Sequence, residues 1–481
     1  MFTDSSSSVS STLPVGIVLN SANPAQYADP HPLLPCIKCI ELKNITCSST
    51  LLRSLLSTLL TLDNGVTWHL TECYILSCKE DAVRWAVTET FATLSLIRKA
   101  CTLEMPLMKS GPGLWEALHG LDIKSLCLSG GFSCLNVNHA DSMSQSLSSL
   151  THLDTLSIKG DDDSPDLWKA LHGLNIKSLS LNGRLFGLNV NHADSLSQTL
   201  SSLTHLNTLS IKSVNCSPDL LEALHGLNIK SLSLSGAYGG LKVNYADLMS
   251  QSLSSLTHLD TLSIEMDYYS PGLWEALHGL NIKSLSVSGA YPYGGSNINC
   301  ADLMSQSLLS LTHLDTLSIK VDDDSPGLWE ALHGLNIKSL SLSGRYGSIE
   351  VHYADSMSQS LSSLTHLDTL SIKVDDDSPG LWKALHGLNI ISLSLSGTLR
   401  GLCVHYADLM SQSLSSLTHL DTLSIEANYY SRGLWDALHV LNIKSLSLSV
   451  WSEDLNVNNV DSVPQSLSSL THLNTLSIEA N

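Results

Sequence analysis

A block of 53 residues recurs seven times in this chain, from about residue 113 to the last residue. Successive blocks are 53 residues apart except once, where the step is 55. A fixed period of this length is typical of a solenoid, in which each unit packs only on its neighbours. The repeat therefore predicts a stacked array, and such arrays usually act by binding. One position marks the seven copies: Trp115, Trp168, Leu221, Trp274, Trp329, Trp382 and Trp435.

Each block is predicted to contain two units, each with one helix and one strand. In the copy that begins at Ser325, serine followed by Pro326 suits a helix start, because serine caps free N–H groups and proline fits the first helical position. A second helix is predicted at Asp355, which we expect to cap it. Apolar residues recur at helical spacing in both. They are Leu328, Ala331, Leu332 and Leu335 in the first and Met357, Leu361 and Leu364 in the second.

A strand is predicted after each helix. Leu340 and Leu342 alternate with serine, as in a strand that buries one face. The other face of the sheet is then lined mostly by small hydroxyl residues, followed by a charged residue that varies between copies. These residues are Ser339, Ser341, Ser343, Thr369 and Ser371 in one copy, and Lys159, Lys212, Glu265, Lys320, Lys373, Glu426 and Glu479 along the array.

Both predicted strands fit the pattern L-x-x-L-x-L, from Ile337 to Leu342 and from Leu367 to Ile372. In this the chain resembles leucine-rich repeat (LRR) proteins of the ribonuclease-inhibitor-like class, and in particular the LRR region of invertebrate NLR-type (NACHT/NB-LRR) innate immune receptors. The resemblance implies an α/β solenoid shaped as a curved horseshoe, with a parallel β-sheet on the concave face and helices on the convex face. It covers the repeats only, because the nucleotide-binding module of those receptors is missing.

Weaker matches to the pattern begin upstream at Ile37, Trp68 and Phe91. We therefore predict about 17 units in all. The predicted organisation is a disordered Ser/Pro-rich leader over residues 1–32, degenerate N-terminal LRR units over 33–112, and seven 53-residue double repeats over 113–481 without a C-terminal cap.

Charge and cysteine usage limit the partners and the compartment. The chain has 25 basic and 45 acidic residues, a formal net charge of −20, so we expect neither nucleic acid nor an anionic membrane as a partner. No apolar run reaches the roughly 18 residues of a membrane span, and the N-terminus lacks the pattern of a signal peptide. The 11 cysteines are odd in number and crowd towards the N-terminus, which does not suit a disulfide framework. The cytoplasm is the predicted location.

Two loops differ between copies, and they hold 11 of the 13 tyrosines. Tyr245, Tyr353 and Tyr406 share one position and are expected to pack on the first turn of a helix. The other eight are predicted to bind a protein ligand, because tyrosine offers a large amphipathic contact area at low entropic cost. The alternative is that the sequences of these surface loops have changed without selection for binding. The candidate protein-binding residues are Tyr238, Tyr268, Tyr269, Tyr291, Tyr293, Tyr346, Tyr429 and Tyr430.

No catalytic residue, cofactor site or metal site is predicted. The phosphate-loop, H-E-x-x-H and G-x-S-x-G motifs are absent, and 14 of the 20 histidines recur with the repeat and so belong to the fold. Zinc binding by Cys36, Cys39, Cys73 and Cys78 is less favoured, because the first two lie in a predicted strand and Cys73 fills a regular LRR position.

Aspartate triplets occur in three copies of the block. Each precedes a helix, where acidic side chains suit the helix dipole, and this interpretation is preferred to calcium binding, which needs fixed ligand spacing. The triplets are residues 161–163, 322–324 and 375–377.

The function predicted from these features is a non-catalytic protein-protein interaction scaffold, a ligand-recognition module of the innate-immune NLR type. The alternatives are a passive structural or adhesive LRR protein, inside or outside the cell, and a fragment of a larger receptor. A GTPase-activating adaptor would need a residue that breaks the repeat, such as Arg400 or Arg432. Neither the ligand nor the oligomeric state follows from the sequence.

Overall fold

The computed structural model describes residues 16–20, 39–43, 46–60, 67–71, 74–76, 95–97, 102–106, 112–129, 139–160, 162–183, 187–213, 217–236, 245–266, 271–289, 301–321, 324–344, 349–397, 401–428, 434–438, 441–451 and 470–480. The chain divides into two compact units, Met1–Lys212 and Ser213–Asn481. Among the described residues, no helix has the length and apolar character needed to cross a membrane.

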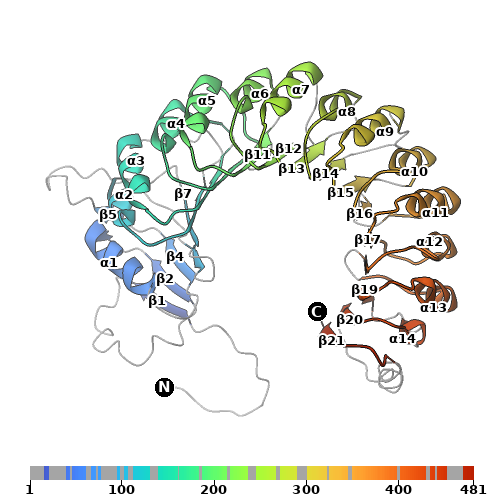
Figure 1. The fold of residues 1–481 in the computed structure, drawn as a ribbon. Coiled ribbons are helices and arrows are strands. Elements are labelled where there is room, and N and C mark those ends of the chain that lie inside the picture. Colours follow the sequence, from blue (N-terminus) through green and yellow to red (C-terminus); the bar gives the residue numbers. More distant parts are fainter. Residues whose placement is uncertain are drawn as a thin grey trace, which may run out of the picture. The chain divides into compact units, whose positions relative to one another are not determined.

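The first unit begins with short strands and continues as a parallel sheet with helices between its strands (Figure 1). β6 runs antiparallel to β7, and from β7 to β11 each described strand pairs in parallel with the next. Before them, β1, β2 and β4 form one parallel sheet and β3 pairs with β5. The elements are β1 (Gly16–Asn20), β2 (Cys39–Lys43), β3 (Thr46–Ser48), α1 (Ser49–Leu60), β4 (Thr67–Thr71), β5 (Tyr74–Leu76), β6 (Ser95–Ile97), β7 (Thr102–Pro106), α2 (Pro112–Leu118), β8 (Ser125–Ser129), α3 (Ala140–Ser149), β9 (Thr155–Lys159), α4 (Pro165–Leu171), β10 (Ser178–Asn182), α5 (Ala193–Ser202) and β11 (Thr208–Ser213).

The second unit repeats strand and helix with one topology throughout. Its strands pair in parallel in chain order from β12 to β21, and its helices lie on one side of that sheet (Figure 1). The elements are α6 (Pro218–Leu224), β12 (Ser231–Gly236), α7 (Ala246–Ser255), β13 (Thr261–Met266), α8 (Pro271–Leu277), β14 (Ser284–Gly289), α9 (Ala301–Ser310), β15 (Thr316–Val321), α10 (Pro326–Leu332), β16 (Ser339–Gly344), α11 (Ala354–Ser363), β17 (Thr369–Lys373), α12 (Pro379–Leu385), β18 (Ser392–Ser396), α13 (Ala407–Ser416), β19 (Thr422–Asn428), α14 (Leu434–Leu438), β20 (Ser445–Trp451) and β21 (Thr475–Ala480).

This arrangement is the α/β leucine-rich-repeat solenoid predicted from the sequence. β2, β4 and β6 fall on the weak upstream matches to the LRR pattern. Two features were not predicted: β6 is antiparallel to its neighbour, and β1 is a strand inside the segment 1–32 that was expected to be disordered. The other residues of that segment lie outside the described part of the chain.

The core is a ladder of aliphatic side chains that run in register from strand to strand. Leu340 of β16 lies opposite Leu317 of β15 and Leu370 of β17, and each of the three is 0% exposed. The serines and threonines between the leucines are half-buried on the open face, which confirms the predicted alternation. Among the described strands β21 pairs with β20 alone, and its Leu476 and Ile478 are 44% and 51% exposed. Burial of each leucine therefore depends on the neighbouring repeat.

The helix starts follow the prediction in one unit of the block and differ in the other. Ser325 caps α10, since its hydroxyl accepts a hydrogen bond from the Leu328 N–H at 3.2 Å. The expected cap of α11, Asp355, instead lies in the first turn, and Tyr353 is the N-cap residue without a side-chain capping bond. The prediction of an aspartate cap was wrong because the helix begins at Ala354, before Asp355, and the apolar spacing marks the buried face from Met357 but not the first helical residue.

Each short helix is tied to the longer helix that follows it by hydroxyl groups. The hydroxyl of Ser360 in α11 donates to the backbone carbonyl of Trp329 in α10. Ser363 accepts a hydrogen bond at 2.8 Å from the N–H of Gly334, a residue with φ of +75° in the turn after α10. The serines of the L-S-S segment thus join the two units of a block, and the turn glycine supplies the backbone conformation that this bond needs.

Replacing Gly334 by alanine is expected to lower the free energy of unfolding by about 1 kcal/mol, the usual cost of the left-handed conformation for a residue with a Cβ atom. A Cβ atom there would meet nothing within 4 Å, so steric overlap adds nothing. Hydrogen exchange of the α10 and α11 amides in Gly334→Ala measures the change, with the exposed neighbour His333→Ala as the control. Equal stability of Gly334→Ala and the wild type would contradict the assignment.

Candidate binding surface

The eight tyrosines predicted to bind a protein lie outside the described residues. They are Tyr238, Tyr268, Tyr269, Tyr291, Tyr293, Tyr346, Tyr429 and Tyr430. The structure does describe the three that share the remaining loop position. Tyr245, Tyr353 and Tyr406 are the N-cap residues of α7, α11 and α13, with exposed fractions of 47%, 46% and 43%. Nearly half of each residue is therefore accessible, and the three occupy equivalent places in the third, fifth and sixth copies of the block.

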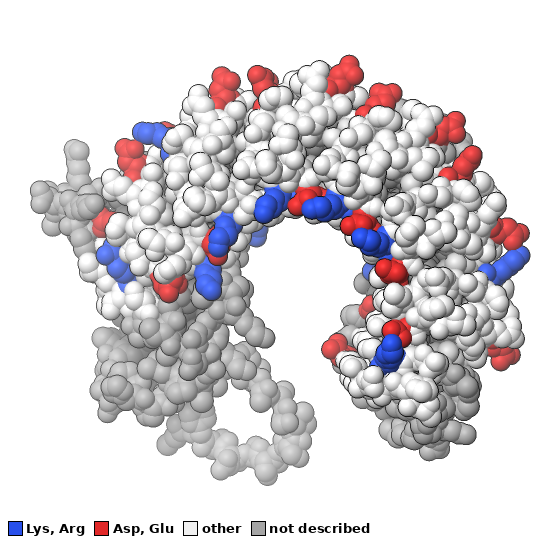
Figure 2. Space-filling model, in the orientation of Figure 1, with Lys and Arg blue, Asp and Glu red and all other residues white. Residues whose placement is uncertain are grey.

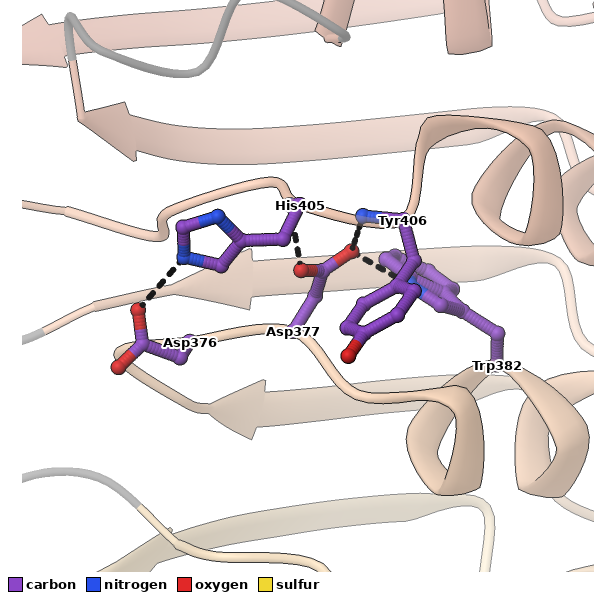
Figure 3. Close-up of polar contacts among 5 residues, drawn as sticks. All are labelled: Asp376, Asp377, Trp382, His405 and Tyr406. Carbon is purple, nitrogen blue, oxygen red and sulfur yellow. Dashed lines mark hydrogen bonds and ion pairs between the residues drawn. The ribbon is translucent and has the colours of Figure 1, made fainter.

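A buried carboxylate holds the loop that carries this tyrosine. In the sixth copy of the block, Asp377 precedes α12 and is 4% exposed. Its carboxylate accepts hydrogen bonds from the indole N–H of Trp382 at 2.8 Å and from the backbone N–H groups of His405 at 2.6 Å and Tyr406 at 3.0 Å (Figure 3). One aspartate thus connects the short helix of its own unit to the start of the next helix. We call this arrangement the aspartate clamp.

The aspartate clamp recurs in the two other copies that contain an aspartate triplet. The clamping carboxylate is that of the third aspartate of each triplet, Asp163 and Asp324, which are 4% and 3% exposed. The donors are Trp168, Asn191 and His192 for Asp163, at 2.8, 2.8 and 3.1 Å, and Trp329, His352 and Tyr353 for Asp324, at 3.2, 2.9 and 2.8 Å.

The clamp corrects the interpretation of the aspartate triplets. The helix is capped by serine, as the 3.1 Å bond from the Leu381 N–H to the Ser378 hydroxyl shows, so the third aspartate is a buried acceptor and not a helix-dipole residue. The sequence did contain a signal for it, because the aspartate precedes tryptophan by five residues in all three copies. The copy with Leu221 in place of tryptophan has Cys216 in place of the aspartate.

The fourth copy has the tryptophan but not the aspartate five residues before it. Tyr269, which lies outside the described residues, takes the aspartate position. The indole N–H of Trp274 is buried there with no hydrogen-bond partner within the described part of the chain. The tryptophan position therefore needs a large apolar side chain, and in the three clamp copies an aspartate also accepts a hydrogen bond from its indole N–H.

The open side of the sheet carries alternating charges. Lysines that precede the strands pair with an aspartate of the preceding unit, and basic and acidic side chains alternate along this side of the second unit (Figure 2). In the sixth copy Ile391 takes the lysine position and is 45% exposed. The pairs are Lys177 with Asp154 at 2.8 Å, Lys283 with Asp260 at 2.7 Å, Lys338 with Asp315 at 2.9 Å and Lys444 with Asp421 at 2.7 Å.

The ion pair of Lys283 with Asp260 shifts the pKa values of its two members in opposite directions. The hydrogen bond from Lys283 lowers the pKa of Asp260 below its ordinary value of 3.8. The same bond raises the pKa of Lys283 above 10.5. The aspartate part of the stabilisation is present above about pH 3.8 and is lost as pH falls through the lowered pKa. The lysine part is present below pH 10.5 and is lost as pH rises through the raised pKa.

Replacing Lys283 by methionine is expected to raise the pKa of Asp260, because the largest influence on that carboxylate is removed. NMR titration of the Asp260 carboxyl carbon measures this. Lys230→Met should raise the same pKa less, since Lys230 acts on Asp260 only through its charge, and Lys444→Met, at another pair, should leave it unchanged. An Asp260 pKa that is the same in Lys283→Met and in the wild type would show that the pair does not form.

The hollows between the helices recur with the repeat. One hollow of about 270 Å³ is lined by residues that include Leu253 and Ile282. Another hollow of about 230 Å³ is lined by the equivalent residues, which include Leu361 and Ile390. A catalytic site is needed once, whereas these hollows repeat with the fold. They are therefore features of helix packing.

No known protein family and no curated protein sequence matches this chain. Solved structures similar to it include TLR13 in complex with ssRNA13, with 14% identity, a TM-score of 0.38, and coverage of 92% of this chain and 68% of that one. The leucine-rich repeat-containing protein LegL7 of Legionella pneumophila has 12% identity and a TM-score of 0.34, over 79% of this chain and 91% of that one. The LRR protein LIC12759 of Leptospira interrogans has 14% identity and a TM-score of 0.33, over 79% and 85%.

The chain has a leucine-rich-repeat fold. The assignment rests on the in-register leucine ladder and on the helices between successive parallel strands from β7 to β20.

Proposed function

We propose that this chain is a non-catalytic scaffold that recognises a protein through the loops at the ends of its strands. The observation that carries the proposal is the row of exposed tyrosines at one repeated position, Tyr245, Tyr353 and Tyr406. An aspartate clamp fixes the backbone of the last two. A tyrosine on a fixed backbone loses little entropy when a partner covers it, which is the usual property of a protein-binding residue.

Charge supports a protein over nucleic acid as the partner. The formal net charge of −20 repels a phosphate backbone, and the lysines of the described ion pairs are already matched by aspartates. The proposed surface also includes the eight predicted tyrosines, two of which, Tyr238 and Tyr346, precede Tyr245 and Tyr353 by seven residues in the sequence. In the proposed role the chain is an LRR ligand-recognition module of the innate-immune NLR type, of the ribonuclease-inhibitor-like class, and acts in the cytoplasm. Within the described part of the chain Cys403 is a free thiol, which suits a reducing compartment.

Partner capture from an extract of the source cells tests the surface. Replacing Tyr268, Tyr269, Tyr291 and Tyr293 by alanine is expected to reduce capture of the same partner by at least about tenfold, the effect of losing 1.4 kcal/mol. Thermal unfolding should not change, because loop side chains add little to the core. A matched variant with four alanines on the open face, at Ser339, Ser341, Thr369 and Ser371, separates the loops from the sheet. Loss of capture only in that variant would place binding on the sheet and contradict the proposal.

A full-length transcript read through both ends of the coding region tests the NLR assignment. A nucleotide-binding module encoded upstream in the same message is the expected result. A message that holds the repeats alone would contradict the assignment and leave a separate LRR binding protein.

A further inference from the structure

Asp376 is the middle residue of the third aspartate triplet, and it lies on the opposite side of its loop from the aspartate clamp. Asp376 is exposed while Asp377 is buried, because successive residues of an extended segment point to opposite sides. Asp376 forms an isolated parallel bridge with Cys403. Backbone bonds fix this register, from the Cys403 N–H to the Asp375 carbonyl at 2.7 Å and from the Asp377 N–H to the Cys403 carbonyl at 3.1 Å.

The same register brings three different ligand groups together. Cys403 and His405 are two residues apart on an extended segment, so both side chains point to the side on which Asp376 lies. The His405 Nε2 atom is 3.2 Å from an Asp376 carboxylate oxygen (Figure 3). The Cys403 Sγ, His405 Nε2 and Asp376 oxygen atoms all lie within 4.8 Å of one another. The residue between them, Val404, is 6% exposed and forms part of the core.

We propose that Asp376, Cys403 and His405 form a binding site for a borderline-soft divalent transition metal, with zinc as the expected ion. Zinc accepts thiolate, imidazole and carboxylate ligands at about 2.0–2.3 Å, which places ligand atoms about 3.5 Å apart in a tetrahedron. The present separations need only small side-chain rotations to reach that arrangement. Three protein ligands leave the fourth position to water or to a side chain of a partner. Magnesium and calcium are excluded by the sulfur and nitrogen ligands, since both ions prefer oxygen.

The surroundings of the site favour a cation. Asp377 binds the backbone N–H of His405 at 2.6 Å and so fixes the segment that carries two of the ligands. Asp375 and Asp376 place negative charge beside the Cys403 thiol, and this charge attracts a metal ion. On binding, the sulfur–hydrogen bond breaks, the proton passes to solvent and the metal–sulfur bond forms, with no change of oxidation state.

The second copy of the block supplies a natural control. There Asp162 forms the equivalent isolated bridge with Asn189, and the side-chain amides of Asn189 and Asn191 donate to the Asp162 carboxylate at 3.3 and 3.4 Å. Asparagine thus replaces both cysteine and histidine on the same backbone. These amide groups satisfy the carboxylate by hydrogen bonds and offer no soft ligand, so metal binding is assigned to the sixth copy and not to the second.

The test uses the full chain, reduced and freed of metal by chelation, with Zn²⁺ and Co²⁺ as probes. Zn²⁺ is expected to slow alkylation of Cys403 at least tenfold, measured on the Cys403 peptide by mass spectrometry so that other cysteines do not interfere. Asp376→Asn with His405→Asn should remove this protection while Cys403 stays reactive. Unchanged alkylation of the wild type, or equal protection in the double variant, would overturn the proposed site.

Transplanting residues between copies gives the second measurement. Cys403→Asn with His405→Asn places the second copy's residues in the sixth, so the variant should fold as the wild type does, and it should lose one equivalent of thiolate-to-Co²⁺ absorption. Asn189→Cys with Asn191→His should add one equivalent. A Co²⁺ spectrum that neither exchange alters would show that this backbone does not assemble the ligands, and the proposal would be wrong.

Discussion

Asp377→Ala is expected to lower the free energy of unfolding by about 3–5 kcal/mol, because it removes the acceptor that three hydrogen bonds share. The substitution leaves three N–H groups, those of Trp382, His405 and Tyr406, without their acceptor. Each buried donor without a partner costs roughly 1–3 kcal/mol. Hydrogen exchange is the appropriate measurement, because long repeat arrays do not unfold in one step, and the amides of α12 and α13 should lose protection first.

Two tryptophans provide a matched test of the aspartate clamp. Trp382→Phe removes an indole N–H that is bound to Asp377, whereas Trp274→Phe removes one that has no partner among the described residues. Both side chains are at most 1% exposed, so the change in packed volume is the same. Both substitutions lose the same packing, so we expect Trp382→Phe to cost about 1–3 kcal/mol more than Trp274→Phe. Equal costs would show that the indole bond adds nothing to stability.

Leu340→Ala is expected to destabilise the array by about 2–5 kcal/mol, through lost burial and the cavity that remains. Leu340 is 0% exposed and lies between Leu317 and Leu370 in the ladder. In a one-dimensional stack the loss should act on both neighbours, so exchange should speed up in β15 and β17 together with β16.

The control for Leu340→Ala is the adjacent Ser341→Ala, on the open face of the same strand. Substitutions at such positions usually change stability by no more than about 0.5 kcal/mol. Faster exchange confined to β16 in Leu340→Ala would contradict the nearest-neighbour description.

The fold could be predicted closely because the sequence repeats the same local information seven times. The alternation at Leu340 and Leu342 and the Ser325-Pro326 helix start both depend on residues close in the chain, and both are confirmed. The capping role given to Asp355 was wrong, because the apolar spacing marks the buried face of a helix and not its first residue. β6 was placed correctly but pairs antiparallel, and strand direction is decided by contacts outside the pattern.

The candidate sites were less predictable. The eight loop tyrosines were singled out by their variation and clustering, and their role stays a prediction. The aspartate clamp was missed although its five-residue spacing to tryptophan is visible in three copies, because its other donors lie 28 and 29 residues away. The cluster of Asp376, Cys403 and His405 was missed for the same reason, because Cys403 and His405 lie 27 and 29 residues after Asp376 in the sequence.

The sequence by itself determined the repeat, its helix and strand pattern and the apolar residues that face the core, since these follow from periodicity along the chain. Only the tertiary structure decided what each loop residue contacts. The bridge between Asp376 and Cys403 joins residues 27 positions apart in sequence, and it exists because parallel pairing sets one loop beside the next. Side chains on those loops acquire their chemistry from neighbours in space, and that proximity is a property of the stacked repeats.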